Sequence, residues 1–175
     1  MKVAVFGAQG SGKSTQADLL ASHLGLPHIE TGDLVRDFSE NQKTTDLKDS
    51  LASGQLSPTS LVVRLLKERL DKDDCAAGFV LDGYPRSIEQ YEAFAPELDL
   101  VLVINITDEE AVERLLKRGR EDDTREGIAE RLELYHQETE PVIDIYRQMG
   151  ILHEVNGERP VEEIQKDLVS IIEKK

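Results

Sequence analysis

Residues 7–15 read Gly-Ala-Gln-Gly-Ser-Gly-Lys-Ser-Thr and match the pattern G-x-x-x-x-G-K-[ST], a loop that cradles phosphate groups. The apolar residues 2–6 predict a buried strand before the loop, and residues 15–24 predict a helix with one apolar side after it. Such a turn points successive backbone N–H groups and the positive end of the helix at one anion. The alternative is an ordinary glycine-rich turn, but the full motif in this setting favours a phosphate-binding strand–loop–helix unit.

The motif also assigns individual side chains. Lys13 is expected to reach the β- and γ-phosphates of a nucleotide, and the hydroxyl of Ser14 or Thr15 is expected to reach Mg²⁺. The expected ATP-binding residues of the loop are Gly10, Ser11, Gly12, Lys13, Ser14 and Thr15.

The chain has 175 residues, enough for one hydrophobic core and short of two full domains. No apolar run approaches the ~18 residues of a membrane-spanning helix, so we expect no membrane partner. The predicted first strand begins at residue 2, which leaves no room for a signal peptide before it. One cysteine, Cys75, excludes an internal disulfide and a multi-cysteine zinc site. These features favour a cytoplasmic protein.

The net charge of −14 argues against a nucleic-acid partner, which needs a basic surface. It also raises a problem, because a nucleotide is itself an anion and requires positive charge at its phosphates. Five arginines lie within 18 residues and supply such a concentration: Arg114, Arg118, Arg120, Arg125 and Arg131. The remaining acidic surface suits solubility or a salty habitat, and composition does not separate the two.

Strand-like runs at residues 2–6, 27–30, 79–81, 100–106 and 151–155 alternate with helical patterns. This alternation predicts a parallel sheet covered by helices on both faces. Capping boxes predict helix starts at Ser87 and Thr107, and a weaker box starts at Asp123. Pro160 suits the first position of the last helix, and Pro141 predicts a kink in a long helical stretch. Residues 31–73 carry helical patterns without a good strand.

The segment after the third predicted strand carries polar groups suited to a ligand. Asp82 stands at the carboxyl end of that strand, where ligands of parallel sheets bind, and would hold a metal ion or its water shell. Arg86 offers a planar fork to a phosphate, and Gln90 offers an amide that can read the edge of a base. Alternatively, Asp82 caps a helix or turn, and Gln90 is a solvent-exposed helix residue.

A third group, Thr31-Gly32-Asp33-Leu34-Val35-Arg36, follows the second predicted strand. Arg36 lies one helical turn past Asp33, so one helix can present both. Taken alone, this spacing favours a surface salt bridge between them.

Together these blocks, with Arg114–Asp123 and with Arg131-Leu132 and Tyr135, resemble adenylate kinases in order and spacing over essentially the whole chain. The loop at 7–15 is widespread among nucleotide-binding proteins, whereas the five blocks together are specific to nucleoside monophosphate kinases. The resemblance implies a three-layer α/β/α P-loop fold. Its five-stranded parallel sheet would have the order 2-3-1-4-5, with a helical monophosphate-binding insertion.

The resemblance also implies roles for individual residues. Arg36 and Arg86 would clamp the phosphate of the monophosphate, Thr31 and Gln90 would contact its base, and Arg114 would stack on the ATP adenine. The expected AMP-binding residues are Thr31, Arg36, Gly83, Arg86 and Gln90. The expected catalytic residues are Lys13, Arg86, Arg118, Arg120 and Arg131. Ser14 and Asp82 would hold Mg²⁺, mainly through water. For Arg114, Arg118 and Arg120 the alternative is a set of helix-surface salt bridges, such as Glu110 with Arg114.

The implied reaction is ATP + AMP = 2 ADP. The acceptor oxygen of AMP is already anionic, so the reaction needs aligned phosphates and positive charge rather than a strong base. A closing lid would exclude water. Here only Gly119 separates Arg118 from Arg120, which predicts a minimal lid at 118–124 without zinc. We therefore expect one P-loop kinase domain over 1–175, a second moving part at 31–60, and a monomer.

Three functions remain open from the sequence. The first is an ATP:AMP phosphotransferase, which Thr31 and Gln90 favour over a kinase of UMP or CMP. The second is another small-molecule P-loop kinase, and the polar residues 38–49 depart from the family pattern at the base-selecting helices. The third is a nucleotide-binding regulatory ATPase, which would need no second phosphate clamp such as Arg36 and Arg86.

Overall fold

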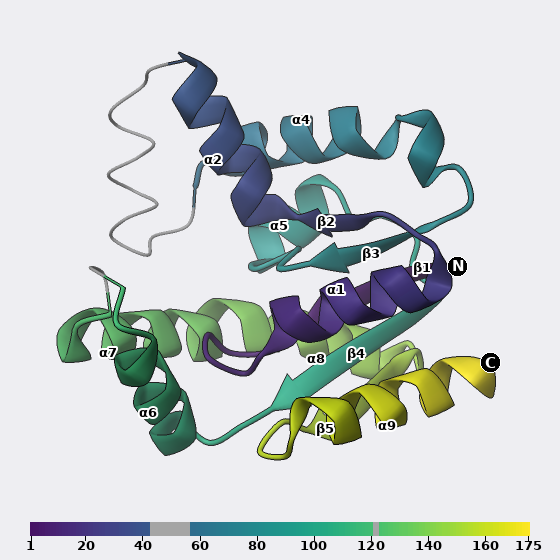
Figure 1. Cartoon of the computed structure of the whole chain (residues 1–175). Coiled ribbons are helices and arrows are strands. Elements are labelled where there is room, and N and C mark those ends of the chain that lie inside the picture. Colours follow the sequence, from purple (N-terminus) through teal and green to yellow (C-terminus); the bar gives the residue numbers. More distant parts are fainter. Residues whose placement is uncertain (43–56, 121–122) are drawn as a thin grey trace.

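The computed structural model describes residues 1–42, 57–120 and 123–175 (Figure 1). The strands are β1 (Lys2–Phe6), β2 (His28–Glu30), β3 (Phe79–Asp82), β4 (Leu100–Asn105) and β5 (Leu152–Asn156). The longer helices are α1 (Lys13–Leu24), α2 (Thr31–Gln42), α4 (Thr59–Leu70), α6 (Asp108–Arg118), α7 (Arg125–Leu134), α8 (Glu140–Gln148) and α9 (Val161–Glu173). Three shorter helical elements complete the described chain, namely the 3₁₀ turn η1 (Asp73–Cys75), α5 (Ile88–Ala93) and the π-helical turn η2 (Tyr135–Thr139).

The five strands form one sheet in the order β2-β3-β1-β4-β5, and every neighbouring pair is parallel. This confirms the expected strand number, direction and order. Because β1 lies between β3 and β4, the chain crosses to opposite sides of β1, and a crevice opens at the carboxyl ends of these strands. The loop at 7–15, Asp82 and the residues after β4 all lie at that end.

Alternate residues of the strands face two separate cores. Val3 and Val5 of β1 join the core under α1 and α9, whereas Ala4 and Phe6 join the core under α2, α4 and α8. Figure 1 shows the same division, with α1 and α9 in front of the sheet and α8 behind it. The arrangement confirms the three-layer α/β/α fold.

A third, smaller core places α6 and α7 beside the phosphate-binding loop. Ala8 of the loop packs with Ala111 and Leu115 of α6 and with Ile128 and Leu132 of α7. Figure 1 shows these two helices next to the amino end of α1, while α2 and α4 lie on the β2 side of the sheet. The carboxyl ends of the strands therefore lie between two pairs of helices, α2 with α4 and α6 with α7, that come from distant parts of the sequence.

The observed N-caps confirm two of the predicted helix starts and correct two others. Ser87 and Thr107 are N-caps, and each side chain accepts a hydrogen bond from the backbone N–H three residues later. The box at Asp123 is wrong by one residue, because Thr124 is the N-cap and accepts from Gly127. Pro160 is also the N-cap of α9 rather than its first residue. The long helical stretch changes to π geometry at Tyr135–Thr139, and Pro141 stands in the first turn of α8.

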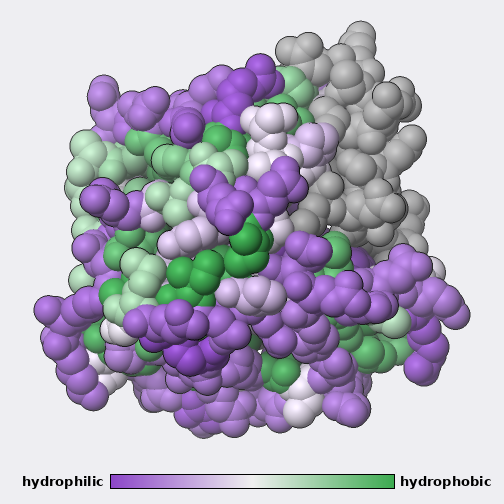
Figure 2. Space-filling model, turned by 180° about the vertical axis from the view of Figure 1, so that it is seen from behind, coloured by the Kyte–Doolittle hydropathy of each residue, from purple (hydrophilic) through white to green (hydrophobic). Residues whose placement is uncertain are grey.

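The outer surface is largely hydrophilic, as expected for a chain with 32% charged residues. Figure 2 shows one face, where purple hydrophilic residues surround a smaller group of green hydrophobic residues near the centre. Among the described residues, no helix has the length and apolar character needed to cross a bilayer.

Two adjacent leucines of α1 provide a test of the packing. Leu20 is fully buried in the core under α1, whereas the neighbouring Leu19 is 39% exposed. Leu20→Ala is expected to lower the free energy of unfolding by about 2–5 kcal/mol, because it leaves a cavity against the sheet. Leu19→Ala is the matched control and is expected to change it by less than about 1 kcal/mol. Urea denaturation measures both, and equal losses would contradict the described packing of α1.

Candidate active site

The loop between β1 and α1 has the geometry that its glycines predict. The backbone N–H of Ser11 donates to the carbonyl of Ala8 at 3.1 Å, which closes a tight turn. Gly10, the third residue of that turn, has φ +87°, and Gly12 is also left-handed at φ +83°. Helix α1 then begins at Lys13, two residues earlier than expected, so the N–H groups of its first turn face the crevice without partners in the helix.

Lys13 and Asp82 place opposite charges at the centre of the crevice. Burial lowers the pKa of Lys13, the Asp82 carboxylate opposes that shift, and the cations of Arg86 and Arg118 add to it. The influence of Arg86 and Arg118 means that both guanidinium groups act on the same small region as Lys13. The carboxylates of Asp82 and Glu30 oppose the effect of these cations on the pKa of Lys13.

Asp82 is the last residue of β3 and is only 1% exposed. Burial raises the pKa of its carboxyl, but His28, Lys13, Ser14 and Arg86 outweigh burial and lower the pKa overall. The nearest nitrogen of His28 lies 3.8 Å away, which is an ion-pair contact rather than a hydrogen bond. Both carboxylate oxygens lack a hydrogen-bond partner among the described residues. Asp82 is thus a buried anion left open toward the loop.

Arg86 is anchored through its backbone and its side chain. Its Nε donates to the carbonyl of Gly83 at 2.7 Å, and its backbone N–H donates to Oε1 of Gln90 at 2.8 Å. The hydroxyl of Thr139, on η2, donates to the carbonyl of Arg86 at 2.9 Å. Gly83 has φ +74°, and a Cβ there would lie 2.5 Å from the guanidinium. Only glycine therefore leaves room for this position of Arg86.

Thr31 and Gln90 both face this segment, and both are buried. The hydroxyl of Thr31 donates to the carbonyl of Gly83 at 2.9 Å, and Oε1 of Gln90 is occupied by the backbone of Arg86. Gln90 is thus not the solvated helix residue that its isolated pattern favoured. In this structure the two side chains hold the loop at Gly83–Arg86, and their contact with a base remains a prediction.

A pocket joins the loop to the segment after β3 and to α7. Its walls are Phe6, Gly7, Gln9, Lys13, Gly83, Arg86, Arg131, Leu134, Tyr135 and Thr139. It brings together four residues of the predicted site, namely Lys13, Gly83, Arg86 and Arg131. The sequence reasoning missed Gln9, Leu134, Tyr135 and Thr139, although Tyr135 belongs to a block that carries the family resemblance.

Asp123 organises the arginines of the α6–α7 turn. Its side chain is fully buried, and its carboxylate accepts two hydrogen bonds from Arg118, at 2.9 and 2.7 Å. It also accepts one from Arg131 at 3.0 Å and one from the backbone N–H of Arg120 at 3.1 Å. The Arg118 side chain lowers the pKa of Asp123 despite burial, with further contributions from Arg120 and Arg131. The sequence pattern suggested Asp123 only as a helix cap, yet its carboxylate contacts all three predicted catalytic arginines of this region. The side chain of Arg120 itself is exposed.

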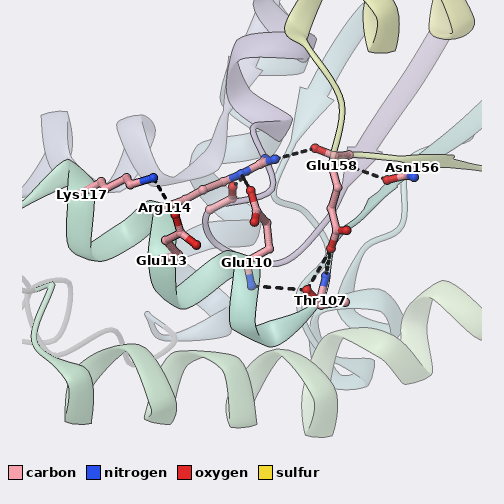
Figure 3. A network of polar contacts seen from close by, with 9 residues as sticks. Thr107, Glu110, Glu113, Arg114, Lys117, Asn156 and Glu158 are labelled. Atoms are coloured by element: carbon pink, nitrogen blue, oxygen red, sulfur yellow. Dashed lines mark hydrogen bonds and ion pairs between the residues drawn. The ribbon is translucent and has the colours of Figure 1, made fainter.

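Arg114 holds the loop from the side of α6 (Figure 3). Its guanidinium donates to Glu110 at 2.7 Å, to the carbonyl of Gly157 at 2.9 Å and to the carbonyl of Gly10 at 3.4 Å. The pair with Glu110 is the alternative contact that the helical spacing predicted. Arg114 therefore touches the predicted ATP-binding loop, and its stacking on adenine remains a prediction.

Arg36 lies outside the pocket walls. It is 49% exposed and pairs with Glu30 at 3.1 Å and with Asp33 on the same helix. This is the surface salt bridge that the spacing alone favoured. The structure thus gathers Lys13, Arg86, Arg118 and Arg131 near one crevice, while Arg36 is held back by two carboxylates.

Comparison with known sequences identifies the family. The sequence pattern of the family Adenylate kinase matches residues 5–151. The chain belongs to the adenylate kinase family. An adenylate kinase of Mycobacterium sp. (strain MCS) is 44% identical to it, over 84% of this chain and 86% of that protein. Adenylate kinases of Leptospira biflexa and Bifidobacterium longum are 39% and 40% identical, over 98% and 99% of this chain and all of those proteins.

The buried carboxylate of Asp123 gives a stability prediction for this adenylate kinase family member. Asp123→Asn is expected to lower the free energy of unfolding at pH 7 by on the order of 3 kcal/mol, because Arg118 and Arg131 lose their counter-charge. Asp71→Asn is the matched control, since Asp71 is exposed at the end of α4. It is expected to have no measurable effect.

The same variant has a defined pH dependence. Because the pKa of Asp123 is lowered on folding, its stabilisation is present above the unfolded value of about 3.9 and is lost only as pH falls below it. Urea denaturation should therefore show a constant difference between wild type and Asp123→Asn from pH 7 to about 5. A difference that disappears within that range would contradict the ion-pair assignment.

Proposed function

We infer that this chain transfers the γ-phosphoryl group of ATP to AMP and forms two molecules of ADP. The observation that carries this conclusion is the pocket in which the phosphate-loop lysine, Lys13, shares walls with Arg86 and Arg131. Membership of the adenylate kinase family supports the same reaction. A regulatory ATPase needs the lysine but not a second set of cations facing it.

The proposed division of the site follows its two sides. On the donor side, we propose that the loop residues Gly10 to Thr15 hold the ATP phosphates, and that Arg114 contacts the adenine. On the acceptor side, Thr31, Gly83 and Gln90 would face AMP, with Arg36 and Arg86 on its phosphate. Arg36 can reach that phosphate only after leaving Glu30 and Asp33, which are its present partners.

The chemistry needs charge stabilisation more than proton transfer. An oxygen of the AMP phosphate attacks the γ-phosphorus of ATP, the bond to the ADP leaving group breaks, and no proton has to be removed from the acceptor. Lys13, Arg86, Arg118, Arg120 and Arg131 would stabilise the negative charge on the transferred group. The contacts of Asp123 hold Arg118 and Arg131 in place before substrate binds, which reduces the cost of ordering them.

The donor set at Asp82 and Ser14 fits Mg²⁺. The open oxygens of a buried carboxylate suit the water shell of a hard cation, and the Ser14 hydroxyl lies in the first turn of α1 on the same side. When bound with ATP, Mg²⁺ supplies further neutralisation of phosphate charge. No cluster of three or more His, Cys, Asp or Glu side chains suited to a metal occurs in the described part of the chain.

We further propose that 1–175 forms one kinase domain and that parts of 31–60 and 118–124 close over the substrates. Residues 43–56 and 121–122 of these segments lie outside the described residues. We also propose that the enzyme works as a monomer. The net charge of −14 supports an enzyme of small nucleotides rather than of nucleic acid, and we propose a cytoplasmic location from the single cysteine.

An activity assay of the purified protein with ATP, Mg²⁺ and a panel of acceptors tests this proposal. We expect ADP formation with AMP to exceed that with UMP, CMP, GMP or shikimate by at least about 100-fold in kcat/KM, a difference typical of hydrogen-bonded base recognition. Preference for UMP or CMP would leave a monophosphate kinase of different specificity. ATP hydrolysis that is equally fast without any acceptor would favour the regulatory ATPase instead.

A further inference from the structure

The side chain of Gln9 lines the pocket with an amide oxygen that no described residue hydrogen-bonds. It lines the same pocket as Lys13, Arg86 and Arg131. Its Oε1 is buried and has no hydrogen-bond partner among the described residues. An amide oxygen left without a partner away from water is unfavourable, so each such group needs an explanation. A bound ligand that completes the hydrogen bonds explains this one.

The backbone fixes Gln9 at the corner of the loop. In the turn from Ala8 to Ser11, Gln9 is the second residue and Gly10 is the third, with the φ of +87° that a type II turn requires there. The carbonyl of Gly10 accepts from Arg114 at 3.4 Å, and a Cβ on Gly10 would lie 3.1 Å from the carbonyl of Ala111. The turn is thus held against α6 by its backbone, without help from the Gln9 side chain.

Other buried glutamines of the chain show what a structural role looks like. Gln90 accepts from the backbone of Arg86 at 2.8 Å, and Gln16 donates to the carbonyl of Val161 at 2.9 Å. Each one ties its helix to another part of the chain, although Oε1 of Gln16 also lacks a hydrogen-bond partner among the described residues. The amide oxygen of Gln9 has no such contact among the described residues, and Gln9 differs from Gln16 in that it lines the pocket that holds the cations.

The position of Gln9 in the pocket indicates which part of the substrates its side chain would contact. Under the proposed function, the loop residues after Gln9 face the donor phosphates, and Arg86, which lines the same pocket, faces the acceptor phosphate. The transferred phosphoryl group has to pass between these two sides. A carboxamide there can donate through Nε2 to a phosphoryl oxygen and can accept through Oε1 from a guanidinium.

We propose that Gln9 is a further catalytic residue of phosphoryl transfer, and this proposal rests on the proposed function. Its amide donates a hydrogen bond to an oxygen of the transferred group and accepts one from an arginine of the site. The amide gains and loses no proton, while the phosphorus bond to ADP breaks and the bond to AMP forms. A neutral donor placed there stabilises charge that spreads over the transferred group, so its effect falls on kcat more than on KM.

Steady-state kinetics of Gln9→Met tests this role, because methionine keeps the length of the side chain and removes both hydrogen-bonding groups. We expect kcat with ATP and AMP to fall about 10- to 100-fold, while KM for each nucleotide changes less than about threefold. Gln9→Glu should lose more, since a carboxylate repels the phosphoryl group. Gln137→Met is the matched control, because Gln137 is exposed and donates a hydrogen bond to Glu133 at 2.8 Å, one helical turn away on the surface. It should behave as wild type.

Stability measurements keep the test decisive. Removing an unpartnered buried oxygen is expected to leave the melting temperature of Gln9→Met unchanged or raised, and a clear loss would overturn the proposal by revealing a structural contact. Gln9→Pro provides a second variant, because proline suits the second residue of a type II turn and preserves the loop. It should show the same loss of kcat.

Three kinetic results would overturn the role of Gln9 alone: an unchanged kcat, a loss confined to KM for AMP, or a loss confined to ATP hydrolysis without AMP. The last would mean that the amide positions water. If wild type formed no ADP from ATP and AMP, the proposed function itself would fail, and the role of Gln9 with it. The wild-type measurement therefore separates the two failures.

Discussion

The site depends on two buried carboxylates that keep several cations close together. Asp82 faces Lys13 beneath the loop, and Asp123 binds Arg118 and Arg131 in the α6–α7 turn. Two like unit charges 4 Å apart repel each other by about 4 kcal/mol even with the partial screening near a protein surface. Without the carboxylates, the guanidinium groups would separate into solvent. With them, a protein of net charge −14 offers a positive site to nucleotides.

The fold brings these charges together from distant parts of the chain. The sheet order places β1 between β3 and β4, so the loop at 7–15 and Asp82 meet at adjacent strand ends. The packing of Ala8 against α6 and α7 brings the arginine-bearing turn to the same end. On the other side, Thr139 of η2 donates to the backbone of Arg86 and connects the layer of α7 and α8 with the acceptor segment. One crevice thus receives cations from the start of α1, from the loop after β3 and from the α6–α7 region.

Sequence reasoning succeeded where the signal was local. The loop motif, the caps at Ser87 and Thr107, and the alternation of strands and helices depend on residues a few positions apart, and the structure confirms them. The strand order came only from the family resemblance. Lys13, Gly83, Arg86 and Arg131 line one pocket, and their roles toward nucleotides, which the family resemblance implied, stay predictions.

The features that were missed depend on tertiary geometry. The box at Asp123 suggested a cap, but the carboxylate turns inward to two arginines, one of them eight residues later, and leaves capping to Thr124. The contact of Thr139 with Arg86 spans 53 residues, and no local pattern indicates it. Gln9 occupies a variable position of the loop motif, and only the assembled pocket shows that its side chain lines the same walls as the cations.

The most direct test of the account is the affinity for a compound in which two adenosines are joined by five phosphates. Calorimetry should show that it binds roughly 100-fold or more tightly than ATP, because one molecule then fills two adjacent nucleotide sites. Arg86→Ala should lose most of this advantage and retain ATP binding, whereas Arg125→Ala, at an exposed position, should match wild type. Affinity no higher than that for ATP would contradict the claim that these cations bring two nucleotides together end to end.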